Sequence, residues 1–212
     1  MKKYHCYSAN FNIETERLFK EATFLGQGNN GIVYKLPEDK VVKLFIEEKV
    51  WQDEGYILTK TNNSKYFPKV FEIGEYYIVR EMIYGTQFNK YIRKNGINEK
   101  IVYNIYELIK EFERLEFTKI DARCKDLYIG QDFSIKVIDP KKYYKRKIDY
   151  PRHFMKGLLK LGVLEEFLFF LKNIDNDLAC SWKEKFINYW NQERKKKRYK
   201  KMKSYQINII NL

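Results

Sequence analysis

Three glycines and a lysine are the residues of this chain whose spacing most clearly suggests chemistry. Gly26, Gly28 and Gly31 follow a G-x-G-x-x-G pattern, and Lys43 lies further along in a β-rich run. Glycines at this spacing let a backbone approach phosphate groups closely, and the pattern also marks dinucleotide-binding folds. We therefore expect a phosphate-binding site around these glycines.

The residues after the third glycine separate the two possibilities. A dinucleotide-binding fold needs a helix there, so that the helix N-terminus faces the pyrophosphate. Instead, 31–36 and 40–45 are both rich in β-formers, with a turn at Pro37 between them. This order predicts a glycine-rich hairpin that covers a nucleotide, followed by a strand that carries a phosphate-binding Lys43. It is the order found in protein kinases.

Hydrophobic periodicity predicts an α+β fold. We expect strands over 22–28, 31–36, 40–45, 66–74 and 76–83, a small hairpin over 127–129 and 134–138, and helices over 14–21, 46–60, 98–116, 151–161, 163–172 and 177–197. Five strands with one helix, followed mostly by helices, predict two lobes with a cleft between them. The expected domains are an N-terminal lobe over 1–82, a reduced helical lobe over 83–193 and a basic tail over 194–212.

The resemblance to protein kinases extends to further residues of the N-terminal half, in the same order. The matching positions are Gly26, Gly28, Gly31 and Val33 in the glycine loop, Lys43 in the third strand, Glu54 in the following helix, and Glu81, Met82 and Ile83 in the adenine-binding hinge. The resemblance implies that Lys43 binds phosphates and pairs with Glu54. It also implies that the backbone of 81–83 contacts the base.

Three aspartates stand where kinases carry their catalytic and metal-binding residues. Asp121 and Asp126 match a D-x-K-x-x-N segment, and Asp139 takes the place of the aspartate in D-F-G. The resemblance implies that Asp121 orients the acceptor hydroxyl while Asp126 and Asp139 hold Mg²⁺, an ion that prefers hard oxygen ligands. It also places Arg123 against the phosphoryl group in transfer.

Two segments depart from the kinase pattern. Lys119-Ile120-Asp121 replaces H-R-D, Asp139-Pro140-Lys141 replaces D-F-G, and no A-P-E signal follows. In this form the sequence is most similar to small serine/threonine protein kinase-like proteins of Gram-positive bacteria, over roughly residues 20–182. Their catalytic segment resembles 117–123 of this chain.

The resemblance implies an ATP- and Mg²⁺-dependent enzyme that phosphorylates a hydroxyl group, with a protein serine or threonine as the expected acceptor. Two alternatives remain open: a small-molecule kinase of the antibiotic or sugar type, and a pseudokinase that binds nucleotide or serves as a scaffold. Lys119 and the short segment after Asp139 count against the first alternative. The retained Lys43, Glu54, Asp121 and Asp139 count against the second.

The net charge of +13 is concentrated near the C-terminus, where 194–203 is almost entirely cationic. One interpretation is a solvated helix end, since cations are favourable near a helix C-terminus. The other is a docking patch for nucleic acid, an anionic membrane surface or an acidic protein.

Cysteine usage and hydropathy predict a cytoplasmic protein. Cys6, Cys124 and Cys180 are far apart and lack C-x-x-C spacing, which favours free thiols in a reducing compartment. No signal peptide is visible at the N-terminus, and the most apolar run, 158–171, is too short and too charged to cross a bilayer.

Overall fold

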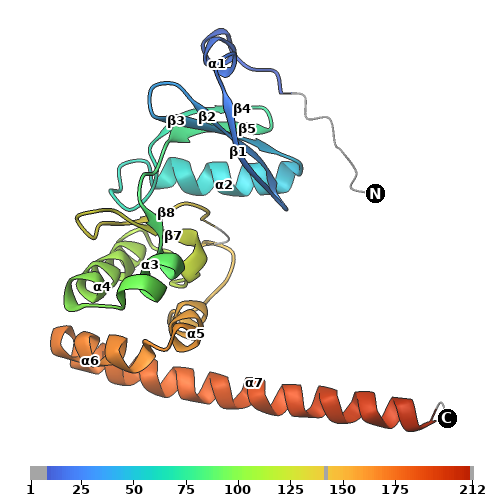
Figure 1. The fold of residues 1–212 in the computed structure, drawn as a ribbon, viewed down its shortest axis with the longest axis vertical. Helices are drawn as coiled ribbons and strands as arrows, with labels where there is room; N and C mark the ends of the chain where they lie inside the picture. Colours follow the sequence, from blue (N-terminus) through green and yellow to red (C-terminus); the bar gives the residue numbers. More distant parts are fainter. Residues whose placement is uncertain (1–8, 141–142, 211–212) are drawn as a thin grey trace.

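A five-stranded antiparallel sheet forms one end of the molecule (Figure 1). The computed structural model describes residues 9–140 and 143–210, with side chains as far as residue 196. The strand order is β1-β2-β3-β5-β4, built from β1 (Thr23–Gly28), β2 (Gly31–Leu36), β3 (Lys40–Phe45), β4 (Val70–Gly74) and β5 (Tyr77–Glu81). This arrangement confirms the predicted α+β class and the five-stranded sheet.

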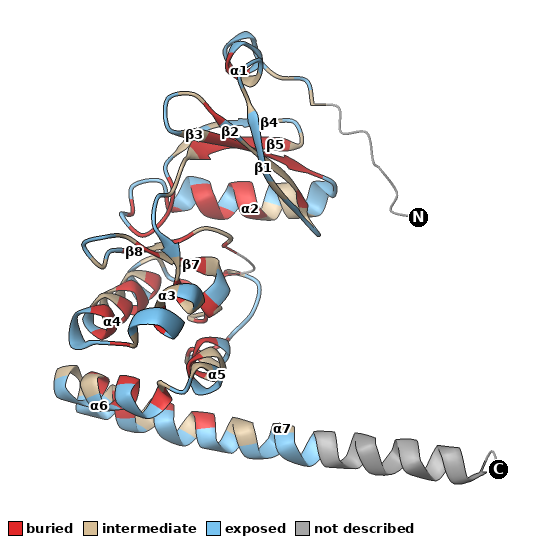
Figure 2. Ribbon diagram, in the orientation of Figure 1, coloured by how far each residue is buried: buried red, intermediate tan, exposed pale blue. Residues whose placement is uncertain are grey.

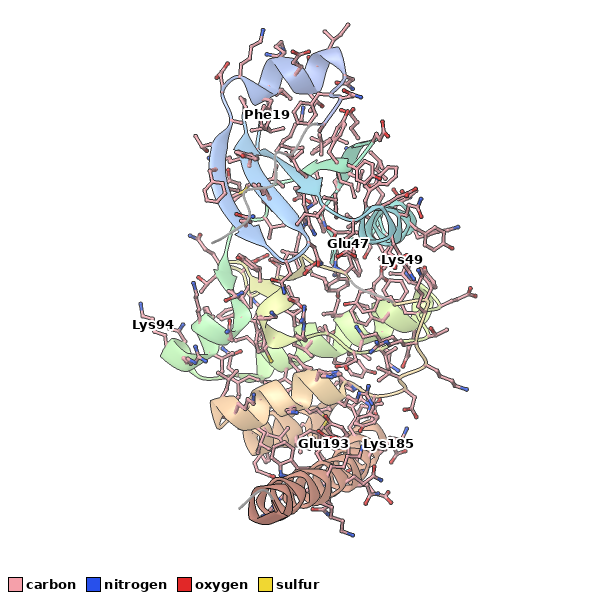
Figure 3. The ribbon with its side chains drawn as sticks, turned by 90° about the vertical axis from the view of Figure 1, so that its right-hand side faces the viewer. Phe19, Glu47, Lys49, Lys94, Lys185 and Glu193 are labelled. Carbon is pink, nitrogen blue, oxygen red and sulfur yellow. The ribbon has the colours of Figure 1, made fainter. Side chains whose placement is uncertain are left out.

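Two helices cover the two faces of this sheet. Leu18 of α1 (Ile13–Phe19) packs with Val42, while Leu58 of α2 (Glu48–Lys60) packs with Phe45. Since successive side chains of a strand point to opposite faces, Lys43 shares the α2 face with Phe45. Figure 3 shows Phe19 beneath α1, and its ring centroid lies 5.1 Å from that of Tyr34.

Helix α2 packs closely on the sheet at Gly55. A Cβ added there would lie 3.6 Å from Ile73 and 3.7 Å from Ile78, an ordinary contact distance, so alanine fits but a longer side chain would push the helix away. The helix was predicted to begin at residue 46, but Ile46 precedes its first residue and is 39% exposed. That prediction was wrong, because the helix begins only at Glu48 and its inner face uses Ile57 and Leu58.

Most of the rest of the molecule is helical. Their bounds are α3 (Phe88–Asn95), α4 (Glu99–Arg114), the 3₁₀ helix η1 (Cys124–Asp126), α5 (Arg152–Leu161), α6 (Leu164–Ile174) and α7 (Asn176–Ile210). The predicted 98–116 helix is confirmed as α4, and its stripe from Ile101 to Phe112 is buried in the largest core cluster. Figure 2 shows this buried face.

A second, three-stranded sheet lies beside α3. It consists of β6 (Thr86–Gln87), β7 (Leu127–Ile129) and β8 (Ile135–Val137) in that order. The β7–β8 hairpin was predicted, whereas β6 was not. Thr86 pairs with Ile129, far away in sequence, so no local pattern marks this strand.

Helix α7 continues beyond the predicted end at 197. Arg194, Lys195 and Lys196 are exposed, but the other side chains of the basic tail lie outside the described residues. Within the described part of the chain, no helix is both long and apolar enough to cross a membrane. Cys124 and Cys180 are free thiols, as predicted, while Cys6 lies outside the described residues. The division into 1–82, 83–193 and 194–212 stays a prediction.

Candidate nucleotide and phosphoryl-transfer site

Two adjoining cavities lie between the five-stranded sheet and the segment from η1 to Asp139. Their volumes are about 690 and 430 Å³, within the range of sites that bind small molecules. They share a lining of Gly28, Val33, Arg80, Lys125, Ile138 and Asp139. The larger cavity reaches Glu81, Met82 and Ile83, and the smaller one reaches Gly31 and Lys43. The structure therefore brings the predicted glycine, lysine and hinge residues around one connected space.

The glycines of the hairpin have two different structural roles. At Gly31, where φ is +152°, an added Cβ would lie 1.8 Å from the backbone oxygen of Leu44, so packing against β3 requires glycine. At Gly26 and Gly28 an added Cβ would meet nothing within 4 Å. Packing within the protein therefore does not explain these two glycines. Both line the larger cavity, where a bare backbone permits close approach of a ligand.

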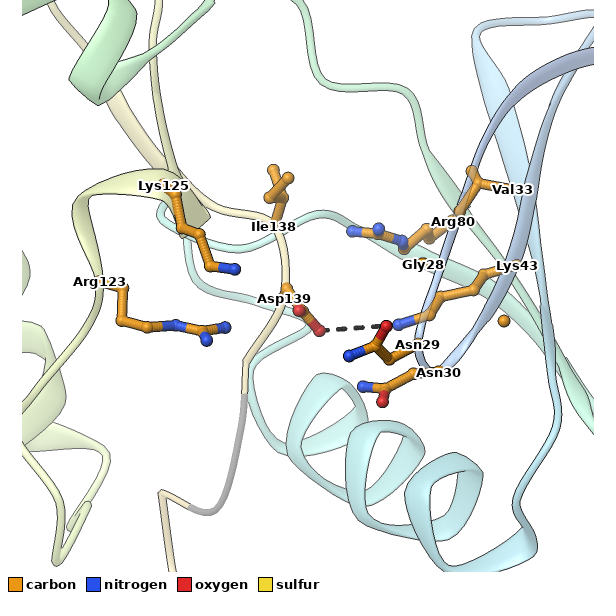
Figure 4. Close-up of a pocket in the computed structure, with 11 residues that line it drawn as sticks. Gly28, Asn29, Asn30, Val33, Lys43, Arg80, Arg123, Lys125, Ile138 and Asp139 are labelled. Carbon is orange, nitrogen blue, oxygen red and sulfur yellow. Dashed lines mark ion pairs between the residues drawn. The ribbon is translucent and has the colours of Figure 1, made fainter. Parts of the chain in front are cut away.

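Lys43 is held between two carboxylates. Its Nζ lies 2.5 Å from Oε2 of Glu54. On the other side it lies 3.6 Å from Oδ1 of Asp139, a pair that Figure 4 marks with a dashed line. The Glu54 side chain is buried, and burial raises its pKa, although Lys43 and then Arg80 oppose that rise. The predicted Lys43–Glu54 pair is thus present, and it fixes the ammonium group at the wall of the smaller cavity.

Arg80 is a cavity residue that was not predicted from the sequence. It shares a face of β5 with Ile78, and in the register of the sheet it lies opposite Val41, two residues from Lys43. Its side chain is 7% exposed, lines both cavities, and has no hydrogen-bond partner for Nε among the described residues. Figure 4 shows it pointing into the cavity beside Lys43. The feature of the sequence that could have indicated this role is a charged residue within the β-forming run at 77–81.

The hinge segment has one backbone amide for which the described residues provide no backbone acceptor. The amides of Glu81 and Met82 donate to the carbonyls of Lys69 and Asp39 at 2.8 and 2.7 Å. Among the described residues, the Ile83 amide has no such acceptor. The Glu81 carboxylate pairs with Lys136 at 2.8 Å, which ties the end of β5 to β8. Of the predicted base contacts, the Ile83 amide is therefore the one available as a donor.

Asp126 and Asp139 face the same cavity from neighbouring segments. The Ile138 amide donates to the carbonyl of Asp126 at 2.9 Å, and this bond places Asp139 beside η1. Arg123 contacts both carboxylate oxygens of Asp126, at 2.5 and 3.1 Å. Arg123 lines the smaller cavity with its guanidinium group on Asp126, and its predicted contact with the phosphoryl group stays a prediction.

The two carboxylates fit a magnesium ion bound together with a nucleotide. Mg²⁺ in such sites takes one or two carboxylates, and substrate phosphates and water complete its shell. Within the described residues, no group of three or more His, Cys, Asp or Glu side chains is arranged to hold a metal. Asp126 and Asp139 supply the hard oxygen donors that such a shared site needs, and Arg123 lies close enough to neutralise Asp126 before the ion binds.

Asp121 lies beneath a third cavity of about 250 Å³, which also contacts Arg123, Asp126 and Asp139. Its side chain is 1% exposed, and Oδ1 accepts hydrogen bonds from the amides of His153 at 3.0 Å and Phe154 at 3.3 Å. Oδ2 pairs with Nδ1 of His153. The predicted catalytic aspartate is thus close to Asp126 and Asp139, the predicted metal-binding pair, but its own oxygens are turned toward the first turn of α5.

Lys119 also borders this third cavity, at the position where kinases carry a histidine. Its Nζ lies 4.8 Å from the ring centroid of Tyr143, and burial lowers the pKa of its ammonium group. His153, in contrast, has no other histidine or metal-ligand pattern near it in the sequence. Its contact with Asp121 joins residues 32 positions apart, so no local motif could have revealed it.

Sequence comparison supports a kinase-like similarity. Over 134 residues the chain is 23% identical to a Bacillus subtilis (strain 168) protein described as "Putative serine/threonine-protein kinase YrzF". The matched region covers 60% of this chain and 62% of that protein, which is less than two thirds of its length. No protein-family model matches the sequence.

Proposed function

We propose that this protein is a two-lobed, kinase-like phosphotransferase that transfers the γ-phosphoryl group of ATP to a hydroxyl group, with Mg²⁺ as cofactor. The observation that carries the proposal is the Lys43–Glu54 pair at the wall of a cavity that also holds the glycine hairpin and Asp139. The similarity to the Bacillus subtilis protein points in the same direction.

The charge distribution of the site suits phosphoryl transfer. The reaction depends mainly on positioning and on neutralising the charge of the phosphates. Lys43 and Arg80 enter the smaller cavity from the sheet, and Arg123 and Lys125 enter it from the opposite wall (Figure 4). A triphosphate in this cavity would meet cationic side chains from both sides.

Each remaining part of the site has a role in this account. The bare backbone at Gly26 and Gly28 covers the nucleotide, and the Ile83 amide donates to the base. Mg²⁺ held by Asp126 and Asp139 would neutralise charge on the phosphates. Because the third cavity adjoins these two carboxylates, it is the place for the acceptor hydroxyl, and we propose a protein serine or threonine as its source.

A pseudokinase that only binds nucleotide is the second candidate. The burial of Asp121 favours it, because a carboxylate that is 1% exposed does not reach an acceptor directly. Incubation with ATP labelled at the γ-phosphate separates the two candidates. We expect Mg²⁺-dependent transfer of label to the protein itself or to a protein substrate, and none with Asp139→Asn. Nucleotide binding without transfer to any protein or small hydroxyl acceptor would favour the second candidate.

For the basic tail we propose electrostatic docking to a polyanion or an acidic partner. The exposed Arg194, Lys195 and Lys196 begin this cationic run. Binding to heparin, used as a model polyanion, should weaken steeply as salt rises, because such binding releases counterions. Deleting 194–212 should remove heparin binding and leave ATP binding unchanged. Salt-insensitive binding, or binding that survives the deletion, would contradict this role.

A further inference from the structure

The pair formed by Asp121 and His153 joins a buried carboxylate to a partly exposed imidazole. Asp121 is 1% exposed, whereas the His153 side chain is 42% exposed. Both border the third cavity, together with Asp126 and Asp139. A buried carboxylate that holds one ring nitrogen of a histidine, whose ring also reaches a reaction cavity, is the arrangement by which enzymes orient an imidazole for proton transfer.

Several contacts fix the position of the two residues. The amide of Ile120 donates to the carbonyl of Ile148 at 2.9 Å, which anchors the segment entering α5 beside Asp121. Helix α5 then approaches η1 closely, because a Cβ added at Gly157 would lie 2.4 Å from Sγ of Cys124. Backbone contacts on the Asp121 side and on the α5 side of the pair therefore fix the position of the imidazole.

The contact also determines which ring nitrogen is available. An ionised carboxylate only accepts hydrogen bonds, so Nδ1 of a neutral His153 carries the proton. Nε2 is then the nitrogen with a free lone pair. Asp121, whose second oxygen accepts two backbone amides of α5, has no exposed oxygen left for a substrate.

We propose that His153 is the residue that accepts the proton of the acceptor hydroxyl, and that Asp121 is the positioning residue that orients it. This inference rests on the proposed phosphotransferase function. As the acceptor oxygen forms its bond to the γ-phosphorus of ATP, its proton moves to Nε2 of His153. The bond from that phosphorus to the β–γ bridging oxygen breaks, and ADP leaves with the electron pair. The imidazolium returns its proton to water.

The surroundings of His153 hold charges of both signs. Lys119, Arg123 and Arg146 line the third cavity, as do the carboxylates of Asp126 and Asp139. An acceptor hydroxyl that enters this cavity would therefore meet both the imidazole and the proposed metal-binding carboxylates, and transfer from a bound nucleotide requires both.

His153→Asn is the first test, because its side-chain amide still donates to Asp121 while lacking a basic nitrogen. We expect kcat to fall by about 10²- to 10⁴-fold, the usual contribution of a general base. The Kd of Mg-ATP, measured by calorimetry, should stay within about twofold. Lys160→Gln, an exposed change on the same helix, is the matched control and should keep wild-type kcat and Kd.

His153→Ala with added imidazole is the second test, since a structural role gives no such rescue. We expect imidazole to restore part of the lost transfer in His153→Ala, and to restore none in Asp139→Asn. For the positioning role, Asp121→Asn should lower kcat while leaving the KM for ATP unchanged, because its amide would donate to Nδ1 and place the proton on Nε2.

The outcomes distinguish this inference from the proposed function. Wild-type kcat in His153→Asn would overturn the inference and leave the phosphotransferase standing. If His153→Asn lost nucleotide binding, His153 would only support the structure of α5, and the inference would be overturned. The same conclusion would follow if His153→Ala lost transfer and imidazole restored none of it. A wild-type protein that transfers no phosphate would remove the proposed function, and the inference with it.

Discussion

Nζ of Lys43 lies 2.5 Å from Oε2 of Glu54, and both side chains are almost fully buried. The contact joins β3 to α2, and it exists because Lys43 lies on the face of β3 that α2 covers. The lysine is therefore part of the fold as well as of the site. This double role determines what its replacement does.

Lys43→Met should lower both transfer and stability. The change leaves the Glu54 carboxylate buried without its cation, and breaking a buried pair in this way costs about 3–5 kcal/mol. The double variant Lys43→Met/Glu54→Gln removes the stranded charge, so it should recover much of the stability but none of the transfer. Urea unfolding and a γ-phosphate transfer assay measure the two effects. Equal stability of the single and double variants would contradict a net role for the buried pair.

Glu54 should make stability decrease with rising pH. Burial raises the pKa of this carboxyl in the folded protein above its ordinary value of 4.5. A raised folded-state pKa means that the folded state binds the proton more tightly, so the stabilising contribution is present below that ordinary value and is lost as pH rises through the folded-state pKa. The unfolding free energy of wild type relative to Glu54→Gln should therefore fall as pH rises from 4.5. If the unfolding free energy of wild type relative to Glu54→Gln rose with pH, Lys43 would be lowering the pKa of Glu54 instead.

Two glycine substitutions should separate packing from ligand binding. Gly31→Ala places a Cβ against the backbone of Leu44, and we expect a loss of about 3 kcal/mol or more. Gly28→Ala meets no protein atom, so its unfolding free energy should change by about 0.5 kcal/mol at most. Its Mg-ATP affinity should fall about tenfold, equivalent to about 1.4 kcal/mol. Unchanged nucleotide affinity in Gly28→Ala would argue against close approach of phosphates there.

Arg80→Met should weaken nucleotide binding. The guanidinium group is buried at the wall of both cavities, and a hydrogen bond to a charged group contributes about 1.5–3 kcal/mol. We expect the Kd of Mg-ATP to rise by about tenfold or more. Arg93→Met, an exposed change on α3, is the control. If both variants bind Mg-ATP equally well, Arg80 does not contact the nucleotide.

The parts of the site that the sequence predicted are those that depend on local spacing. The glycine hairpin, Lys43 and Glu54 belong to consecutive elements, and the short turn between Leu36 and Lys40 sets the register of β2 with β3. Strand β6, Arg80 and His153 depend instead on pairings between distant segments. Arg80 becomes a cavity residue only through its place opposite Val41, and His153 only through the packing of α5 on η1. Local periodicity contains neither relationship.

The orientation of the Asp121 side chain also depends on a distant segment. Its position five residues before Asp126 suggested a catalytic carboxylate, and it does line the same cavity as Asp126 and Asp139, the proposed metal-binding pair. Its orientation was not predictable, because it is determined by two amides of a helix that starts 31 residues later.

Calorimetric titration with ATP tests the central claim most directly, namely that the cavity between the sheet and Asp139 binds a magnesium nucleotide. Wild type should bind one ATP in the presence of Mg²⁺, with an affinity at least about tenfold weaker in EDTA, a difference of about 1.4 kcal/mol. Asp139→Asn should show the same affinity in Mg²⁺ and in EDTA, because half of the carboxylate pair is gone. Absence of ATP binding by wild type, or an undiminished Mg²⁺ effect in Asp139→Asn, would contradict the account.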